Sequence, residues 1–348
     1  MRLPLRLAWV LVPWLAVVGI RCASPPAPAV ASPAVIVASI APPAESSAPT
    51  PTTSSPPPTP PAASNGWTAA PGGWNHAMVL LPNGNPLAIQ GNEMIELAAA
   101  NGEVLRRQPA CSGPHGSAAG MLDDRRFVMV CDGRILQYDI PSLTSQQVAT
   151  LTGFTVSGAA FHPSWVVVAD IQHVLSQATR IVGFDPSSWA QRFSFDLKVD
   201  DAEGVAVSAD GRMLAVGGGG LLQVRELPSL RIVLDKRTQR GRVTATSFSP
   251  DGRRLFVHDE TFEAAIWDVA AKARAPVFKV GSWVTSSLWI DDHTVIATGS
   301  DGVVQLSDRG DKVLIDGMEG VGLALSRRER LACYGSSGGQ VRCRQLRP

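Results

Sequence analysis

The sequence carries almost no net charge and none of the common short motifs of enzymes. Its 348 residues include 31 lysines and arginines against 30 aspartates and glutamates, a formal net charge of +1 at pH 7. Such a chain has no general electrostatic attraction for nucleic acid or acidic membranes. It also lacks a Gly-x-Ser-x-Gly elbow, a His-Glu-x-x-His helix and a glycine loop that enters a helix. We therefore predict no nucleic-acid partner, and the motifs indicate no catalytic residue, metal or cofactor.

Long apolar runs are also scarce, and the one at the N-terminus is short. Leu7–Ile20 follows two basic residues, Arg2 and Arg6. A run of this length is typical of the core of a secretory signal and is too short for an ordinary membrane span. We predict that residues 1–22 are a signal peptide or signal anchor and that the chain is exported. The expected location is a bacterial periplasm, envelope or extracellular space, with membrane contact only through this segment.

The processing of this signal stays open between three alternatives. Cys22 resembles the acylated cysteine of a bacterial lipoprotein, but Arg21 stands where a small residue is usual. Cleavage after Ala31 is a second alternative, and an uncleaved anchor is the third.

Residues 23–66 have almost no charged residues and are rich in proline. They hold thirteen prolines and a single charged residue, Glu45. Such a segment buries too little apolar surface to offset its chain entropy, so we predict a disordered, semi-rigid linker.

The rest of the chain lacks the hydrophobic periodicity of helices. It shows instead a sequence repeat of about forty residues. Short strand-like segments recur with their middle residues 41, 46, 41, 42, 40 and 36 positions apart. The seven copies are centred on Leu97, Tyr138, Phe184, Arg225, Trp267, Ser307 and Cys343. This period is typical of a β-propeller. We predict that residues 67–348 form an all-β, monomeric, seven-bladed propeller of four-stranded antiparallel blades.

The fifth repeat shows the expected blade most clearly. Its strands are predicted at 243–249, 254–258, 264–269 and 276–280, with a Pro-Asp-Gly turn after the first. Ser249-Pro250-Asp251-Gly252 and Ile266-Trp267-Asp268-Val269 resemble the WD40 (WD40/YVTN-type) repeat family, and Tyr138-Asp139 and Phe184-Asp185 are weaker copies. One true Trp-Asp pair and no Gly-His pair make this a divergent member, with quinoprotein-like and lactonase-like propellers as near alternatives.

The ends of the repeat region suggest how the ring closes. The last repeat stops at a third strand, 340–346, whereas an extra extended segment, 66–70, precedes the first repeat. Pairing the two would complete the seventh blade and remove two open sheet edges. The resemblance to WD40 proteins implies the same closure.

Four cysteines follow Cys22, and the strand pattern favours one pairing among three. Cys333 and Cys343 lie on neighbouring strands about a turn, and Cys111 and Cys131 fall at the same rim of adjacent blades. We predict disulfides 111–131 and 333–343, which persist in an exported protein. Four free thiols in the core are the alternative.

The loops that enter the inner strands should converge on one mouth of the propeller channel. Their polar and aromatic residues are His76, His115, Asp200, Asp201, Glu203, Arg240, Arg242, Trp283 and Glu319. We also expect His258 and Asp259 on this side, and interpret Gly217–Gly220 as a blade turn. This set is the candidate binding rim. Its residues could also ligate a metal or place an acid beside a base, although they lack metal-ligand spacing.

We predict a non-catalytic protein-interaction platform of the cell envelope, with unidentified protein partners. The alternative is a propeller-type hydrolase or lyase that acts on a sugar or lactone at the channel mouth. Five aromatic residues are assigned instead to packing between blades: Phe161, Trp165, Phe248, Phe256 and Trp267.

Overall fold

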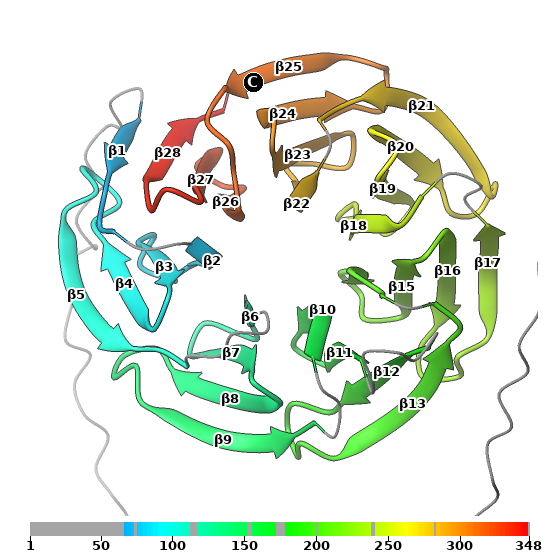
Figure 1. Cartoon of the computed structure of the whole chain (residues 1–348), viewed down its shortest axis with the longest axis horizontal. Helices are drawn as coiled ribbons and strands as arrows, with labels where there is room; N and C mark the ends of the chain where they lie inside the picture. Colours follow the sequence, from blue (N-terminus) through cyan, green and yellow to red (C-terminus); the bar gives the residue numbers. More distant parts are fainter. Residues whose placement is uncertain are drawn as a thin grey trace, which may run out of the picture. The chain divides into compact units, whose positions relative to one another are not determined.

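A computed structural model describes residues 66–72, 75–111, 117–151, 155–171, 178–199, 201–237, 241–281 and 283–346. This part of the chain folds into seven four-stranded antiparallel sheets that surround a central channel (Figure 1). The prediction of an all-β, seven-bladed propeller is confirmed. The predicted signal segment, Cys22 and nearly all of the predicted linker lie outside the described residues. Among the described residues, no helix is long and apolar enough to cross a bilayer.

The first four blades follow one another along the chain, each running from its inner to its outer strand. Blade 1 contains β2 (Asn75–Leu80), β3 (Pro86–Gln90), β4 (Glu93–Leu97) and β5 (Val104–Pro109). Blade 2 contains β6 (Ser117–Met121), β7 (Arg126–Cys131), β8 (Arg134–Asp139) and β9 (Ser145–Thr150). Blade 3 contains β10 (Thr155–His162), β11 (Trp165–Ile171), β12 (Thr179–Phe184) and β13 (Gln191–Leu197). Blade 4 contains β14 (Gly204–Val207), β15 (Met213–Gly218), β16 (Leu221–Glu226) and β17 (Ile232–Arg237).

The last three blades include the one that closes the ring. Blade 5 contains β18 (Val243–Phe248), β19 (Arg254–Asp259), β20 (Glu263–Asp268) and β21 (Ala273–Lys279). Blade 6 contains β22 (Val284–Trp289), β23 (Thr294–Gly299), β24 (Gly302–Ser307) and β25 (Lys312–Asp316). Blade 7 contains β26 (Gly322–Ser326), β27 (Leu331–Gly335), β28 (Val341–Gln345) and, from the other end of the chain, β1 (Trp67–Ala69).

The pairing of β1 with β28 confirms the predicted closure. Trp67 lies opposite Cys343 and Ala69 opposite Val341 in an antiparallel register. The Trp67 indole donates a hydrogen bond to the Ala99 carbonyl at 2.7 Å, which fastens the same strand to blade 1. The seventh blade is therefore held from both ends of the repeat region, and β28 is not left as an open edge.

The predicted strands of blade 5 are found, with one boundary moved. Its outer strand begins at Ala273, three residues before the predicted Pro276. A proline is tolerated there because an outer strand needs no ladder bond on its free edge. The turn before β19 forms as predicted, with the Gly252 amide bonded to the Ser249 carbonyl and Gly252 at φ +69°.

The apolar core lies between blades. One buried cluster joins Leu222 and Val224 of blade 4 to Phe248 and Trp267 of blade 5. Phe256 belongs to the next cluster, between blades 5 and 6, and Trp165 packs at the edge of the cluster between blades 3 and 4. These positions agree with the packing assigned to them.

Phe161 is only half-buried, and its ring is not confined to the space between blades. It packs against blade 2, where a Cβ on Gly120 would come within 2.3 Å of the ring, and it also lines the central channel. The assignment of Phe161 to inter-blade packing alone was therefore incomplete. Small residues on a neighbouring inner strand leave the ring room to reach the channel.

Candidate functional site at one mouth of the central channel

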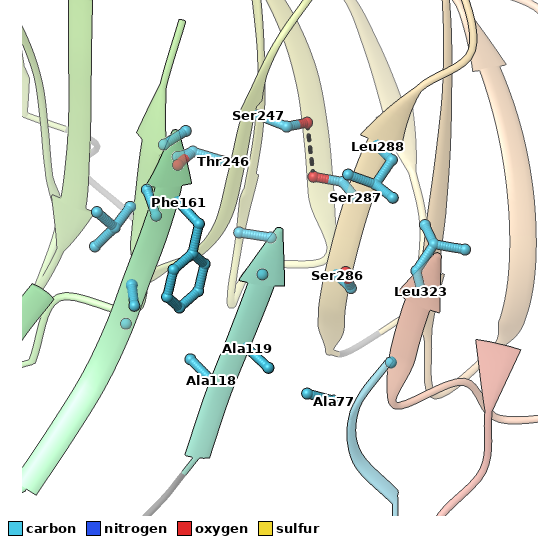
Figure 2. A pocket seen from close by; sticks show the side chains of 18 of the residues that line it. Ala77, Ala118, Ala119, Phe161, Thr246, Ser247, Ser286, Ser287, Leu288 and Leu323 are labelled. Atoms are coloured by element: carbon cyan, nitrogen blue, oxygen red, sulfur yellow. Dashed lines mark hydrogen bonds between the residues drawn. The ribbon is translucent and has the colours of Figure 1, made fainter. Parts of the chain in front are cut away.

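The central channel has a volume of about 690 Å³ and is lined by the seven inner strands. Its wall is made largely of small side chains, among them Ala77, Ala118 and Ala119 (Figure 2). Seven strands converge on a narrow space, so small residues are needed where their faces meet. Hydroxyl groups cross between blades within this wall, and Ser247 Oγ lies 2.8 Å from Ser287 Oγ.

Charged side chains gather at the mouth where the chain enters the inner strands. Asp201 and Glu203 precede β14, and Arg242 precedes β18. Glu260 comes from the turn between β19 and β20, which lies at the same end because successive strands of a blade are antiparallel. We call Asp201, Glu203, Arg242 and Glu260 the Arg242 cluster.

Arg242 is the centre of this cluster and bonds all three carboxylates. Its Nη1 lies 2.6 Å from Asp201 Oδ2 and 3.2 Å from Glu203 Oε1. Its Nε lies 2.9 Å from Glu260 Oε1. The guanidinium also lies 5.5 Å from the Trp283 ring centroid, within cation–π range. An arginine held by so many contacts presents a fixed head group at the mouth.

One carboxyl group of the cluster has a strongly raised pKa. Burial raises the pKa of Glu203 to about 7; the Arg242 charge opposes this rise, and the nearby Asp201 and Glu260 add to it. Asp201 Oδ1, beside it, is buried and has no hydrogen-bond partner among the described residues. Glu203 is therefore a carboxyl that gains or loses its proton near neutral pH.

Glycines behind the cluster allow its backbone to approach blade 4. A Cβ on Gly218 would lie 1.8 Å from the Asp201 carbonyl oxygen, so no other residue fits there without moving this loop. Gly219 and Gly220 follow at φ +36° and +74° in the turn between β15 and β16. The predicted turn is confirmed for Gly219 and Gly220, whereas Gly217 and Gly218 belong to the end of β15. The structure adds a second role for Gly218, which makes room for the loop that carries Asp201.

Two aromatic side chains are exposed beside the cluster. Trp283, just before β22, is 38% exposed, and Phe262, just before β20, is 48% exposed. We call these two residues the aromatic patch. Both residues lie at the same end of blade 5. The Val280 amide donates a hydrogen bond to the Phe262 carbonyl at 3.1 Å, and Trp283 follows Val280 by three residues.

Phe262 adopts a backbone conformation that is unusual for a large side chain. Its φ is +65°, and the equivalent residues before the third strands of blades 2 and 4 are glycines, Gly133 and Gly220. The left-handed conformation costs about 1–2 kcal/mol in a residue with a Cβ. The backbone of blade 5 is therefore strained at Phe262, the residue whose aromatic ring is exposed to solvent.

The structure brings together four of the predicted rim residues: Asp201, Glu203, Arg242 and Trp283. Glu319 lies at the same end of the ring but in blade 7, outside the Arg242 cluster, and its carboxylate accepts a hydrogen bond from Ser337 at 3.0 Å. His115, Asp200 and Arg240 lie outside the described residues, as does the side chain of His76.

His258 and Asp259 lie at this end of blade 5 but do not face the opening. His258 is fully buried, with Nδ1 2.7 Å from Thr244 Oγ1 and Nε2 3.2 Å from the Gly281 carbonyl. A carbonyl only accepts, so Nε2 carries the proton and Nδ1 accepts from Thr244. Burial lowers the pKa of His258, which keeps the ring neutral. Asp259 caps its own turn by accepting the Thr261 amide.

Glu260 and Phe262 were missed by the sequence analysis. The predicted set was drawn from residues before inner strands, with His258 and Asp259 at the end of a second strand, but it stopped short of the turn that follows them. Counting strand directions along residues 243–268 would have found both.

The cysteines form two disulfides in the structure, Cys111–Cys131 and Cys333–Cys343. The first joins blade 1 to blade 2. The second crosses between β27 and β28, where the two residues are directly opposite. Within the described ranges, no three His, Cys, Asp or Glu side chains are grouped to hold a metal ion.

Comparison with known proteins supports the fold and little more. No family model matches the chain. A segment of 77 residues, 22% of the chain, is 35% identical to SEC12-like protein 2 of Arabidopsis thaliana and spans about a fifth of that protein (20%). A propeller chain in the crystal structure of the mitotic checkpoint complex superposes with a TM-score of 0.67 over 86% of this chain and 97% of its own, at 17% identity. The chain thus forms a seven-bladed β-propeller that is similar in fold to that WD40 propeller.

Proposed function

We propose that this propeller is a non-catalytic protein-interaction platform of the cell envelope, and that the mouth with the Arg242 cluster and the aromatic patch is its recognition surface. The observation that carries the proposal is the exposure of Trp283 and Phe262 beside a fixed arginine. Tryptophan and arginine are enriched among the residues that dominate binding energy in protein interfaces. Their conformations are already restricted here, which lowers the entropic cost of binding.

The fold of the similar chain adds general support. That chain occurs in a protein assembly, the mitotic checkpoint complex. A propeller offers a rigid ring on which loops from several blades form one continuous surface. Function on such a scaffold depends on the site, so the proposal rests on the mouth rather than on the fold.

Export to the envelope is part of the proposal and is supported by two features. One is the N-terminal sequence, with a short apolar run followed by a proline-rich segment that would space the propeller from a membrane. The other is the pair of disulfides, which persist in oxidising compartments. Intact mass of the cell-envelope form tests processing, since an acylated Cys22, a start after Ala31 and an uncleaved chain differ in mass.

Cross-linking of the full chain in its native envelope tests the recognition surface. We expect Trp283→Ala to reduce partner cross-links by about tenfold or more, as for a binding hot spot. Ile232→Ala is the matched control, because Ile232 is a comparably exposed apolar residue (43%) on outer strand β17. Equal cross-linking by all three proteins, with the variants folded by circular dichroism, would overturn the proposal.

A second candidate function is acid–base catalysis on a sugar or lactone at this mouth. The observation that favours it is the Glu203–Asp201 pair, in which one carboxyl has a pKa near 7 beside a second carboxylate. Such pairs can divide the roles of acid and base. A panel of lactones and glycosides would be assayed with the wild type, Glu203→Gln and the control Glu319→Gln. Turnover lost in Glu203→Gln alone would establish this function in place of the platform.

A further inference from the structure

We propose that the recognition surface binds a partner polypeptide segment in which a lysine or arginine stands beside an apolar side chain. The inference rests on the proposed function and specifies the chemistry of the partner. It follows from the arrangement of charge and aromatic surface around Trp283.

Carboxylates outnumber cations around the aromatic patch. Asp201, Glu203 and Glu260 surround the single guanidinium of Arg242. Asp301, exposed in the turn before β24, adds a fourth carboxylate, because a Cβ on Gly281 would lie within 2.3 Å of its Cγ. Among these five described side chains, four carboxylates and one guanidinium leave an excess of three negative charges when Glu203 is ionised and two when it is protonated.

Lys279 at the exit of blade 5 does not cancel this excess. Lys279, at the end of β21, lies 2.7 Å from Glu263 Oε1 and is neutralised by that carboxylate. A mouth with unbalanced carboxylates and low-dielectric walls attracts cations and disfavours anions. The negative charge of the surface therefore favours a partner with a basic group.

The aromatic patch supplies the apolar half of the surface. Phe262 and Trp283 leave large apolar areas in water, which is unfavourable unless a partner covers them. The strained backbone at Phe262 supports this interpretation, since blades 2 and 4 avoid the strain with glycine at the same place. A basic side chain can lie against the carboxylates while its apolar neighbour covers the rings.

The chain's own proline-rich segment does not match this surface. Residues 23–66 contain one charged residue, Glu45, which is acidic. That segment has no lysine or arginine to offer, and cleavage at Cys22 or after Ala31 removes the arginines of residues 1–21, so charge complementarity favours a separate protein as the occupant of the processed chain.

Fluorescence anisotropy with designed peptides tests the inference on the full chain. Three fluorescein-labelled probes share Gly-Ser flanks and differ in a central Lys-Leu-Arg, Lys-Gly-Arg or Glu-Leu-Glu. We expect the first to bind about tenfold more tightly than the other two, a difference of about 1.4 kcal/mol. Its affinity should fall as salt rises from about 0.05 M to about 0.3 M, because salt screens exposed charges. Equal binding of the three probes would overturn the inference.

Variants locate the binding and separate it from folding. Phe262→Gly removes the ring and relieves the positive φ, so the fold is kept while Lys-Leu-Arg binding should fall about tenfold. The double change Glu260→Gln and Asp301→Asn should weaken the same probe by about fivefold and reduce its salt dependence. Ile232→Ala should bind like the wild type. Unchanged binding in both mouth variants would contradict the proposed site.

The two proposals can fail separately. If no probe binds, but Phe262→Gly and Trp283→Ala still abolish native cross-links, the mouth is a recognition surface and the basic-segment inference is wrong. If no native cross-link depends on the mouth, the proposed function fails first. Sedimentation that shows a dimer lost in Phe262→Gly would assign the surface to a second copy and would overturn the inference.

Discussion

The hydroxyl of Tyr334 donates a 2.7 Å hydrogen bond to Asp316 Oδ2 and so joins the second strand of blade 7 to the outer strand of blade 6. Arg342 Nη1 bonds the same carboxylate at 2.9 Å. Burial opposes ionisation of Asp316, but the hydrogen bonds from Tyr334, the Met318 amide and Arg342 outweigh it and lower its pKa. This network lies beside the blade in which the two ends of the repeat region meet.

We expect Tyr334→Phe to lower the free energy of unfolding by about 2 kcal/mol, because it removes a hydrogen bond to a charged, partly buried acceptor. Urea unfolding measured by tryptophan fluorescence gives this value. Tyr138→Phe is the matched control, since Tyr138 is the other tyrosine of the sequence and is also buried. Its neutral partners, Ser145 and the Cys111 backbone, predict a loss of only about 1 kcal/mol. An equal or larger loss in the control would argue against the role given to Asp316.

Deletion of residues 67–69 should open the ring. The change removes the pairing of β1 with β28 and the Trp67–Ala99 hydrogen bond, and it uncovers a strand edge. We expect a loss of at least about 3 kcal/mol of unfolding free energy, from several lost hydrogen bonds and the lost packing of the half-buried indole, together with aggregation. Replacement by Gly-Ser-Gly controls for chain length, since it keeps the backbone donors. A deletion as stable and monomeric as the wild type would show that closure is not needed.

Alkylation mass spectrometry checks the two disulfides. The exported chain, alkylated without reduction, should carry no label on Cys111, Cys131, Cys333 or Cys343, and two labels per bridge should appear after reduction. Cys333→Ser should destabilise the oxidised protein by about 2–4 kcal/mol, as for a closed loop of this kind. Four labels before reduction would show free thiols instead.

Glu203→Gln should change how stability depends on pH. The folded pKa of about 7 lies above the ordinary value of 4.5, so between these values the folded state binds more protons than the unfolded state. Stability from this group therefore falls as pH rises from about 4.5 to about 7. We expect the slope to be lost in Glu203→Gln and kept in Glu319→Gln, as measured by urea midpoints at successive pH values.

His258 contributes the opposite slope in an overlapping range. Its lowered pKa means that the unfolded state binds more protons just below pH 6.5, so stability from His258 falls as pH drops there. The variant must therefore be compared with the wild type at each pH. A slope that does not change in Glu203→Gln would contradict the raised pKa of Glu203.

Phe262→Gly should leave the fold as stable as the wild type or more stable, by up to about 1 kcal/mol. The substitution relieves a left-handed φ but adds freedom to the unfolded chain, and these effects partly cancel. Trp189→Gly is a useful contrast, because Trp189 has a φ of +57° and also packs against the core between blades 2 and 3. We expect a clear loss of stability in that variant. A large loss in Phe262→Gly would show that its ring supports the fold.

Local signals were sufficient for the blade pattern. A similar strand end occurs once in each blade, as near Leu97, Tyr138 and Trp267, and the ends are about forty residues apart. This pattern is visible in the sequence because the strands of a blade are close together in the chain. Closure was predictable for a similar reason: a missing strand at one end and an extra one at the other leave a single way to remove the open edges. Only boundaries moved, as at Ala273.

The site could be predicted less well, because its members come from different blades. Glu203 and Arg242 are 39 positions apart, and no sequence period says that their side chains meet at 3.2 Å while Glu319 turns to Ser337 instead.

The sequence by itself determined the number of blades, the way the ring closes and the end of the ring where polar loops gather, since each depends on local strand order. The tertiary structure alone decided that Arg242 binds three carboxylates, that Glu203 keeps a proton near neutral pH and that Phe262 stands in solvent under strain. Those properties depend on burial and on distances between blades, which follow from how the whole ring packs.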